Sequence, residues 1–121
     1  MEQPLVSIII PTYKCPDTLD RAINSVLNQT YKNIEVIVVD DNNPDTEARQ
    51  KTEELVERYI NMDNRIRYIK HEHNKNGAVA RNTGFAIAKG KYISLLDSDD
   101  EYMPERLQKC FDMMENASDN I

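Results

Sequence analysis

A cluster of carboxylates follows directly on a short apolar run near the end of this sequence. The run Tyr92–Leu96 is apolar enough for a buried strand, and residues 97–100 read Asp-Ser-Asp-Asp. Because successive side chains of an extended chain point to opposite sides, Asp97 and Asp99 should face the same way and bring their oxygens together. Hard divalent cations prefer such ligands. The alternative is a solvated acidic turn before a helix that begins near Pro104.

Composition limits the classes of partner. The chain has 121 residues, 40% of them hydrophobic, which predicts one domain with a single core. It carries 15 basic and 21 acidic residues, and the net charge of -6 argues against a broad electrostatic contact with nucleic acid. An anionic substrate would therefore need a bound cation or a few well-placed cationic side chains.

Cysteine usage and hydropathy indicate where the chain resides. Cys15 and Cys110 fit no C-x-x-C pattern, which indicates two thiols in a reducing compartment. The apolar runs are only of strand length, and the start of the chain lacks the pattern of a signal peptide. We therefore expect no membrane span and a cytoplasmic location, with the inner face of the membrane as a second option.

Strand and helix patterns alternate along the chain. Short, nearly continuous apolar runs predict strands that are buried on both faces. Apolar residues at helical spacing predict the helices between them. The predicted strands are Leu5–Ile10, Glu35–Val39, Ile66–Ile69 and Tyr92–Leu96, and the predicted helices lie near Leu19–Leu27, Thr46–Ile60, Ala78–Ala88 and Leu107–Met114.

This order predicts an α/β fold with a doubly wound, mainly parallel sheet and helices on both faces, because each parallel connection needs a crossover. Ligands of such sheets bind beyond the carboxyl ends of the strands, where strand order reverses. The polar residues gather at that edge: Thr12 and Tyr13 follow the first strand, Asp40 and Asp41 end the second, and residues 97–100 follow the fourth. This coincidence favours a ligand site over an acidic turn.

The usual glycine-rich phosphate loops are missing. The three glycines form neither a G-x-G-x-x-G fingerprint nor a G-x-x-x-x-G-K-[ST] loop, which makes a dinucleotide or P-loop site a poor interpretation. If a phosphate binds, a metal held by Asp97 and Asp99 would neutralise most of its charge, with help from Arg81 at the start of the small-residue helix.

Four short stretches carry most of these features. They read VSIIIPTY at 6–13, EVIVVDD at 35–41, NGAVARNTG at 76–84 and LDSDD at 96–100. In this order and spacing they resemble the successive motifs of family 2 glycosyltransferases of the GT-A fold, whose nucleotide-binding half is Rossmann-like. The resemblance covers nearly the whole chain, and it implies that residues 1–121 form the nucleotide-sugar-binding part of a glycosyltransferase domain.

The resemblance implies roles for individual residues. Asp41 would hydrogen-bond the base, commonly uracil, and Asp97 and Asp99 would be the D-x-D motif. Asp99 would ligate Mn²⁺ or Mg²⁺ directly, with Asp97 nearer the ribose and the waters of the metal. The nucleotide-binding residues implied in this way are Pro11, Thr12, Tyr13, Asp41, Arg81, Asp97 and Ser98, and the metal ligands are Asp97 and Asp99.

The implied activity is metal-dependent transfer of a sugar, with inversion, from a nucleotide-diphosphate sugar to an acceptor hydroxyl. A UDP-sugar is the expected donor and a carbohydrate or lipid-linked molecule the expected acceptor, in synthesis of cell-envelope polysaccharide or glycoconjugate. The acceptor-binding half and the catalytic base are expected beyond Ile121, so the chain alone should be poorly active and could self-associate through the surface left open. Lys14 stands where the family usually has Asn.

Two other functions stay open from the sequence. A non-catalytic nucleotide-sugar-binding module would need the same pocket without the catalytic half. A receiver-type signalling domain has similar length, but it requires an acidic pair after the first strand, where Pro11, Thr12 and Tyr13 stand.

Several residues receive structural interpretations. His71 and His73 alternate and could share a metal, but a solvated strand end is preferred. Asp40 is expected to satisfy backbone donors in a turn. Packing is the expected role of the aromatic residues Tyr92, Tyr102 and Phe111 and of the methionines Met62, Met103, Met113 and Met114.

Overall fold

The computed structural model describes the backbone of residues 4–119 and the side chains of residues 4–114. Within this range strands and helices alternate strictly, as the hydrophobic pattern predicts. The elements are β1 (Val6–Thr12), α1 (Pro16–Leu27), β2 (Ile34–Asp40), α2 (Glu47–Met62), β3 (Ile66–Lys70), α3 (Gly77–Ile87), β4 (Tyr92–Leu95) and α4 (Arg106–Asp119).

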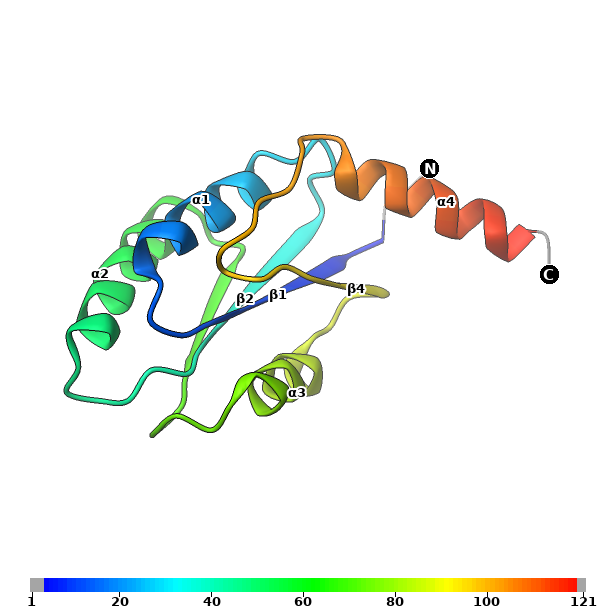
Figure 1. Ribbon diagram of the computed structural model, residues 1–121. Coiled ribbons are helices and arrows are strands. Elements are labelled where there is room, and N and C mark those ends of the chain that lie inside the picture. The colour runs from blue at the N-terminus through cyan, green and yellow to red at the C-terminus, as the bar shows by residue number, and fades with distance from the viewer. Residues whose placement is uncertain (1–3, 120–121) are drawn as a thin grey trace.

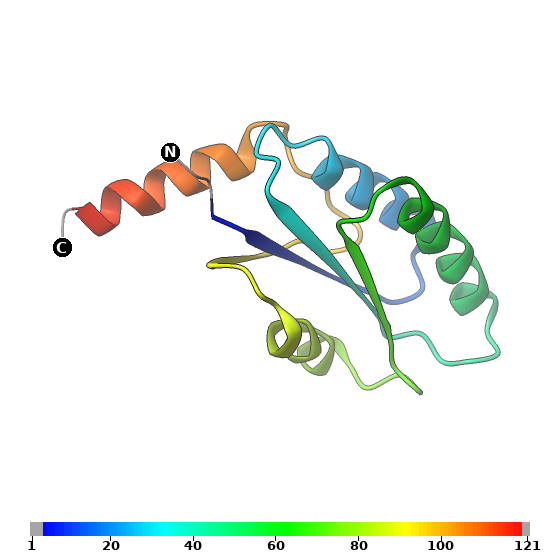
Figure 2. The same ribbon diagram turned by 180° about the vertical axis from the view of Figure 1, so that it is seen from behind.

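The described strands form one parallel sheet in the order β3-β2-β1-β4. The chain moves outward from β1 to β3 and then returns to the other side of β1, so strand order reverses between β1 and β4. Helices α1 and α2 cover one face of the sheet and α3 covers the other (Figure 1, Figure 2). The doubly wound fold with helices on both faces is confirmed.

Side chains on the two faces of β1 enter two separate cores. Ile8 and Ile10 lie in the larger core beneath α1 and α2, whereas Ile9 packs with Ile37, Val39 and Ala80 beneath α3. This alternation is the reason why the strands read as continuous apolar runs.

Helix α3 approaches the sheet closely because the residues on the face that contacts the sheet are small. A Cβ atom on Gly84 would lie 2.5 Å from Cγ2 of Ile9, inside van der Waals contact. The small residues of this helix therefore serve close packing, and they bring its amino end to the carboxyl edge of the sheet.

Strand β1 continues through Pro11 to Thr12, beyond the boundary that the sequence predicts. The carbonyl of Ile9 accepts from Leu96 on the β4 side, and the carbonyl of Thr12 accepts from Asp41 on the β2 side. Because the backbone groups of successive strand residues point to alternate sides, the backbone nitrogen of Pro11 points toward the β4 side, where β4 has already ended at Leu95. Its missing N–H therefore breaks no ladder bond.

The packing prediction holds for the aromatic residues and is wrong for the methionines. Tyr102 is buried, and the Phe111 ring packs against Tyr31 and Tyr92 at centroid distances of 5.3 and 6.2 Å. Met62 ends α2, Met103 lies in the loop before α4, and two lie on α4 itself, which projects from the body (Figure 1). All four are exposed: Met62, Met103, Met113 and Met114.

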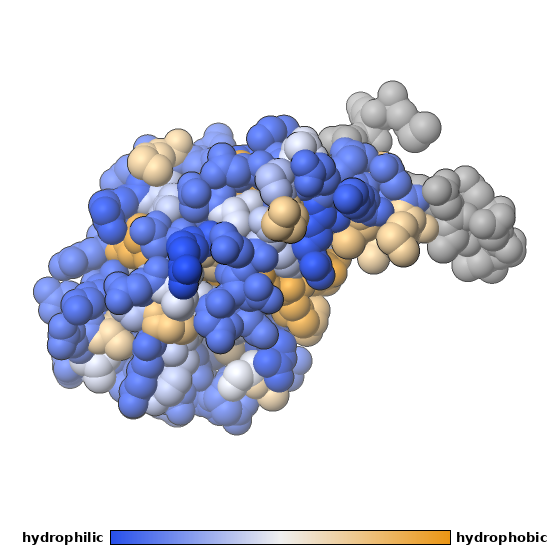
Figure 3. Space-filling view, turned by 45° about the horizontal axis from the view of Figure 1, so that its top comes forward, coloured by the Kyte–Doolittle hydropathy of each residue, from blue (hydrophilic) through white to orange (hydrophobic). Residues whose placement is uncertain are grey.

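Most of the surface in view is polar, with apolar side chains gathered on the side from which α4 projects (Figure 3). None of the described helices combines the length and hydropathy needed to cross a bilayer.

Candidate functional site

A pocket of about 660 Å³ opens at the carboxyl edge of the sheet, at the reversal between β1 and β4. All eight residues predicted to bind nucleotide or metal line this one pocket, although they come from four separate stretches of sequence. The lining consists of Pro11, Thr12, Tyr13, Cys15, Asp41, Asn74, Asn76, Gly77, Ala80, Arg81, Asp97, Ser98 and Asp99.

The loop after β4 turns its acidic side chains into this pocket. Asp97 and Asp99 are exposed on the pocket wall, and Ser98 between them is buried. Oγ of Ser98 lies 2.7 Å from Sγ of Cys15 in the opposite wall. Within the described part of the chain, neither carboxylate makes an ion pair or a side-chain hydrogen bond, so both are free to bind a cation.

The loop after β1 forms the facing wall. Thr12 is buried, and Tyr13 is half exposed over the pocket. Lys14 has a positive φ of 55°, and its backbone N–H donates to Oδ1 of Asn42 at 2.7 Å. The Lys14 ammonium lies 5.1 Å from the Tyr13 ring centroid and outside the pocket lining. Lys14, which stands where the family usually has Asn, therefore contacts the Tyr13 ring without entering the pocket.

Asp41 lies at the carboxyl end of β2 and is only 3% exposed, yet it reaches the pocket wall. Oδ1 accepts from Nδ1 of His71 at 2.8 Å and from the N–H of Lys75 at 2.9 Å. Oδ2 accepts from Nδ2 of Asn74 at 2.8 Å and from the N–H of Asn76 at 3.1 Å. One carboxylate therefore organises the whole segment between β3 and α3.

His71 is buried, so its predicted place at a solvated strand end is wrong. Its ring lies between Asp41 and Thr83, with Nε2 2.9 Å from Oγ1 of Thr83 on α3. His73 is exposed and its Nδ1 lies near the carbonyl of Asn74. The two rings make separate contacts, and no three His, Cys, Asp or Glu side chains of the described residues are grouped to hold a metal.

Asp40 lies behind the pocket and is fully buried. One oxygen accepts from the N–H and the amide of Asn42, which confirms its expected turn-bonding role, and the other lies 3.2 Å from Nε of Arg49. The Tyr68 hydroxyl also donates to Asp40; burial, followed by this hydrogen bond, raises the pKa of Tyr68 far above its usual value. Arg49 donates to the carbonyl of His71 at 2.6 Å, which ties β2 to β3.

The amino end of α3 faces the same pocket. Asn76 caps this helix, since its Oδ1 accepts from the N–H of Val79 at 3.0 Å. Its backbone has φ 114° and ψ 168°, a region that L-residues rarely adopt, and such strain concentrates at ligand sites. Arg81, one turn into α3, supplies a cationic side chain to the lining.

Comparison with known proteins agrees with this geometry. The family model described as "Glycosyl transferase family 2" matches residues 7–121. The chain belongs to glycosyltransferase family 2. The fold predicted from that resemblance is confirmed as well, since the solved structure of TarS from S. aureus superimposes with a TM-score of 0.79 at 30% identity, covering 92% of this chain and 19% of TarS.

Curated relatives of this family 2 chain are considerably longer. An uncharacterized glycosyltransferase of Methanocaldococcus jannaschii is 43% identical over 98% of this chain and 40% of its own length. The Escherichia coli protein named UDP-Glc:alpha-D-GlcNAc-diphosphoundecaprenol beta-1,3-glucosyltransferase WfaP is 42% identical over 92% of this chain and 41% of its own. The chain thus spans about 40% of the length of these relatives.

Sequence reasoning missed part of the pocket of this family 2 domain. Of the residues that were missed, Asn76 had the clearest signal in the sequence. It stands at the start of a small-residue helix, three residues before Val79, and Asn is a typical N-cap. The contacts of His71 had no comparable signal, because its partners come from distant segments. The lining residues that were not predicted are Cys15, Asn74, Asn76, Gly77 and Ala80.

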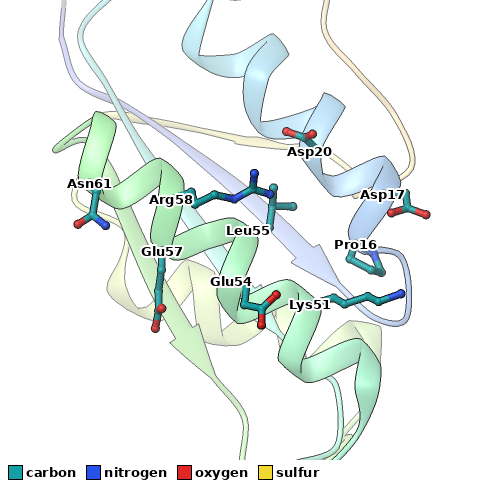
Figure 4. A pocket seen from close by; sticks show the side chains of 9 residues that line it. All are labelled: Pro16, Asp17, Asp20, Lys51, Glu54, Leu55, Glu57, Arg58 and Asn61. Atoms are coloured by element: carbon teal, nitrogen blue, oxygen red, sulfur yellow. The ribbon is translucent and has the colours of Figure 1, made fainter.

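A second cavity of about 790 Å³ lies between α1 and α2, and its lining residues all belong to these two helices (Figure 4). Its walls are helix side chains, and two of its charged groups are paired: Lys51 bonds Glu47, and Asp20 accepts from the Tyr59 hydroxyl. None of the predicted site residues lies there. We interpret it as a solvated groove between two packed helices.

Proposed function

We propose that this chain binds the nucleotide-sugar donor of a glycosyltransferase that transfers the sugar from a UDP-sugar to an acceptor hydroxyl with inversion. One observation carries the proposal: a single pocket lies at the reversal of strand order and combines four kinds of group. These are an apolar and aromatic wall, the buried hydrogen-bond acceptor Asp41, the cationic side chain of Arg81, and the unpaired carboxylates of Asp97 and Asp99. These are the groups that a base, a diphosphate and a metal ion require.

The base and ribose would lie against the first wall. Pro11 and the half-exposed Tyr13 offer flat apolar surface for the base, and Asp41 offers an acceptor for the N3–H of uracil. Since both oxygens of Asp41 already accept two bonds, the base must replace one donor. The Asn74 amide is the side-chain donor on the pocket side and is therefore the group that moves.

The diphosphate would lie between α3 and the loop after β4. The amino end of α3 presents backbone N–H groups to an anion, and Arg81 adds a positive charge. Asp97 and Asp99 fit Mn²⁺ or Mg²⁺, because these ions are commonly held by one or two carboxylates together with substrate phosphates. Among the described residues, no three His, Cys, Asp or Glu side chains are grouped to hold an ion, which is consistent with ligation shared with substrate phosphates. A bound ion would supply Lewis-acid stabilisation of the leaving diphosphate.

The described residues bind and orient the donor in this mechanism. The acceptor hydroxyl attacks the anomeric carbon as the bond to the diphosphate breaks, and its proton passes to a general base. We place that base and the acceptor groove beyond residue 121, in line with relatives that are more than twice as long. Residues 1–121 are then the nucleotide-sugar-binding part of the domain.

The names of relatives support the substrate classes. TarS has been solved with UDP and with UDP-GlcNAc, at 29% and 30% identity to this chain. The name of WfaP includes a UDP-sugar donor and a diphosphoundecaprenol acceptor, and a Bacillus subtilis relative is named for teichuronic acid biosynthesis. We therefore propose a carbohydrate or lipid-linked acceptor, cell-envelope synthesis, and a cytoplasmic enzyme working at the inner membrane face.

A non-catalytic nucleotide-sugar-binding module is the second candidate. It needs the same pocket for the donor, and the residues that line this pocket all lie within the described part of the chain. The receiver interpretation is excluded by the family match.

Calorimetry with UDP in the presence and absence of Mn²⁺ tests the proposed binding. We expect weak binding that requires the metal, and no comparable binding of inorganic phosphate. Failure to bind UDP with either Mn²⁺ or Mg²⁺ would overturn the proposal. A panel of UDP-sugars and acceptors then separates the two candidates: acceptor-dependent UDP release by the full-length protein supports the enzyme, and its absence supports the binding module.

A further inference from the structure

We propose that His71 is a positioning residue that sets nucleobase selectivity, because it holds the Asp41 carboxylate so that Oδ2 faces the pocket. This inference rests on the proposed function, in which Asp41 accepts a hydrogen bond from the base. His71 itself is absent from the pocket lining, so it acts through Asp41 and has no contact with the nucleotide.

The two oxygens of Asp41 have different kinds of partner. Oδ2 is bonded by Asn74 and Asn76, which both line the pocket, so this oxygen is the one on the ligand side. Oδ1 is bonded by His71 and by the N–H of Lys75, and neither residue lines the pocket. Fixing Oδ1 therefore fixes the direction in which Oδ2 points.

His71 is suited to this task because it is held on several sides. Its N–H donates to the carbonyl of Asp40 at 2.9 Å, and its carbonyl accepts from Arg49 at 2.6 Å. Its ring is buried, with Nδ1 on Asp41 at 2.8 Å and Nε2 on Thr83 at 2.9 Å. A ring fixed at both nitrogens and at its backbone cannot swing away from the carboxylate.

The contact with Thr83 holds the Nε2 side of the ring in place, whichever atom carries the hydrogen. A carboxylate only accepts, so Nδ1 must carry the hydrogen that Asp41 receives. The Thr83 hydroxyl has one hydrogen and two acceptors in reach, since Oγ1 also lies 3.0 Å from the carbonyl of Val79. It can thus give its hydrogen to Nε2 or receive one from it, and the ring keeps both contacts either way. Helix α3, which carries Thr83, is connected in this way to the base pocket.

The decisive variants are His71→Ala, His71→Asn and, as matched control, His73→Ala two residues further on and exposed. The side-chain amide of Asn occupies roughly the place of Nδ1, so His71→Asn keeps the donor to Asp41. The probes are UDP and CDP with Mn²⁺, because uracil offers an N3–H donor where cytosine offers an acceptor. Calorimetry gives both affinities and thermal unfolding gives stability.

We expect His71→Ala to weaken UDP binding by roughly tenfold, since one charge-assisted hydrogen bond is lost. The ratio of the affinity for UDP to the affinity for CDP (the UDP-to-CDP ratio) should fall as well. His71→Asn should recover most of the UDP affinity and of the UDP-to-CDP ratio, and His73→Ala should change neither quantity. If His71→Ala does not fold, Thr83→Val frees the ring with little change of shape, and a several-fold smaller UDP-to-CDP ratio is then expected.

A UDP-to-CDP ratio within twofold of the wild-type value in His71→Ala, or in Thr83→Val where that variant is needed, overturns the positioning role. So does a ratio that His71→Asn fails to recover. A wild-type chain that binds no UDP would instead overturn the proposed function and remove the basis of this inference. The wild-type titration therefore separates the two failures.

Discussion

Sγ of Cys15 lies 2.7 Å from Oγ of Ser98, although the two residues are separated by 83 positions in sequence. This contact joins the loop after β1 to the loop after β4, across the reversal of strand order. Both residues line the pocket, as do Tyr13 and the carboxylates of Asp97 and Asp99, so the contact holds the two pocket walls together.

Alkylation of Cys15 should block nucleotide binding. In a Cys110→Ser variant, Cys15 is the remaining thiol, and a maleimide on its Sγ would occupy part of the pocket. We expect UDP titrations of the modified protein to show at least tenfold weaker binding, and UDP with Mn²⁺ to slow the modification. Modification of the exposed Cys110 in a Cys15→Ser variant is the control and should leave binding intact. Unchanged affinity after complete labelling of Cys15 would contradict the assignment of the pocket.

Asp99→Asn should weaken Mn²⁺-dependent UDP binding by roughly tenfold or more with little change in unfolding temperature, because it removes the proposed metal ligand, which is exposed and makes no internal side-chain bond. Asp45→Asn removes the same charge at an exposed turn and is the matched control. Equal affinity of Asp99→Asn and wild type, measured with metal present, would show that Asp99 does not ligate the metal.

Asp41→Ala should lower both binding and stability, in contrast to Asp99→Asn. The buried donor of His71 loses its acceptor, and an unsatisfied buried group costs about 1–3 kcal/mol, whereas the exposed Asn74 amide can bond water instead. UDP binding should weaken by about 1–3 kcal/mol as the base loses its partner. Thermal unfolding and calorimetry on the same sample test this, with exposed Asp112→Ala as control. An unchanged ranking of UDP over other nucleoside diphosphates would remove Asp41 from the base pocket.

Stability should fall as pH rises above about 10. Burial, followed by the hydrogen bond to Asp20, raises the pKa of Tyr59 from 10.0 to about 12, and burial also raises the pKa of Tyr68. The unfolded chain then loses these protons first, so the tyrosines stabilise the fold fully below pH 10 and progressively less between pH 10 and 12. In urea unfolding across this range, Tyr59→Phe should show a shallower loss of stability than wild type. An identical slope would contradict the shifted pKa.

The 121-residue chain should self-associate through β4. This strand pairs on one side with β1, and its Ile93 and Leu95 are 41% and 43% exposed. An apolar strand at a sheet edge favours association. Sedimentation should show concentration-dependent oligomers that Ile93→Lys with Leu95→Lys converts to monomers. The same pair of changes at exposed Met113 and Met114 is the control. A strictly monomeric wild-type chain would contradict this expectation.

The fold and the position of the pocket could be predicted because both follow from short-range patterns. Continuous apolar runs such as Val36–Val39 identify buried parallel strands, and the run before Asp97 places the acidic residues at a strand end. The expected extended alternation of Asp97 and Asp99 is wrong, because the N–H of Asp100 donates to the carbonyl of Asp97 in a turn, and this turn brings both side chains to the pocket. Parallel pairing then brings the strand ends to one edge, and four distant motifs meet there.

Features that depend on neighbouring segments could not be predicted. Pro11 lies within β1 because β4 is shorter than its partner, and strand length is not encoded locally. His71 and His73 look equivalent in sequence, yet Asp41 and Thr83 enclose only the first ring. The exposure of Met103 likewise depends on the path of the loop before α4. In each case the deciding partner is remote in sequence.

The position of β4 also determines when the pocket comes into existence. As the ribosome releases the chain, β1, β2 and β3 can pair in order, while the far side of β1 stays open until Tyr92–Leu95 has emerged. That last pairing has the greatest sequence separation and the slowest loop closure, and an open strand edge invites aggregation meanwhile. Under the proposed function, the nucleotide can bind only after this step, because the loop after β4 carries the second wall. A nascent chain that holds UDP has therefore completed its sheet, and the ligand favours the finished topology over earlier intermediates.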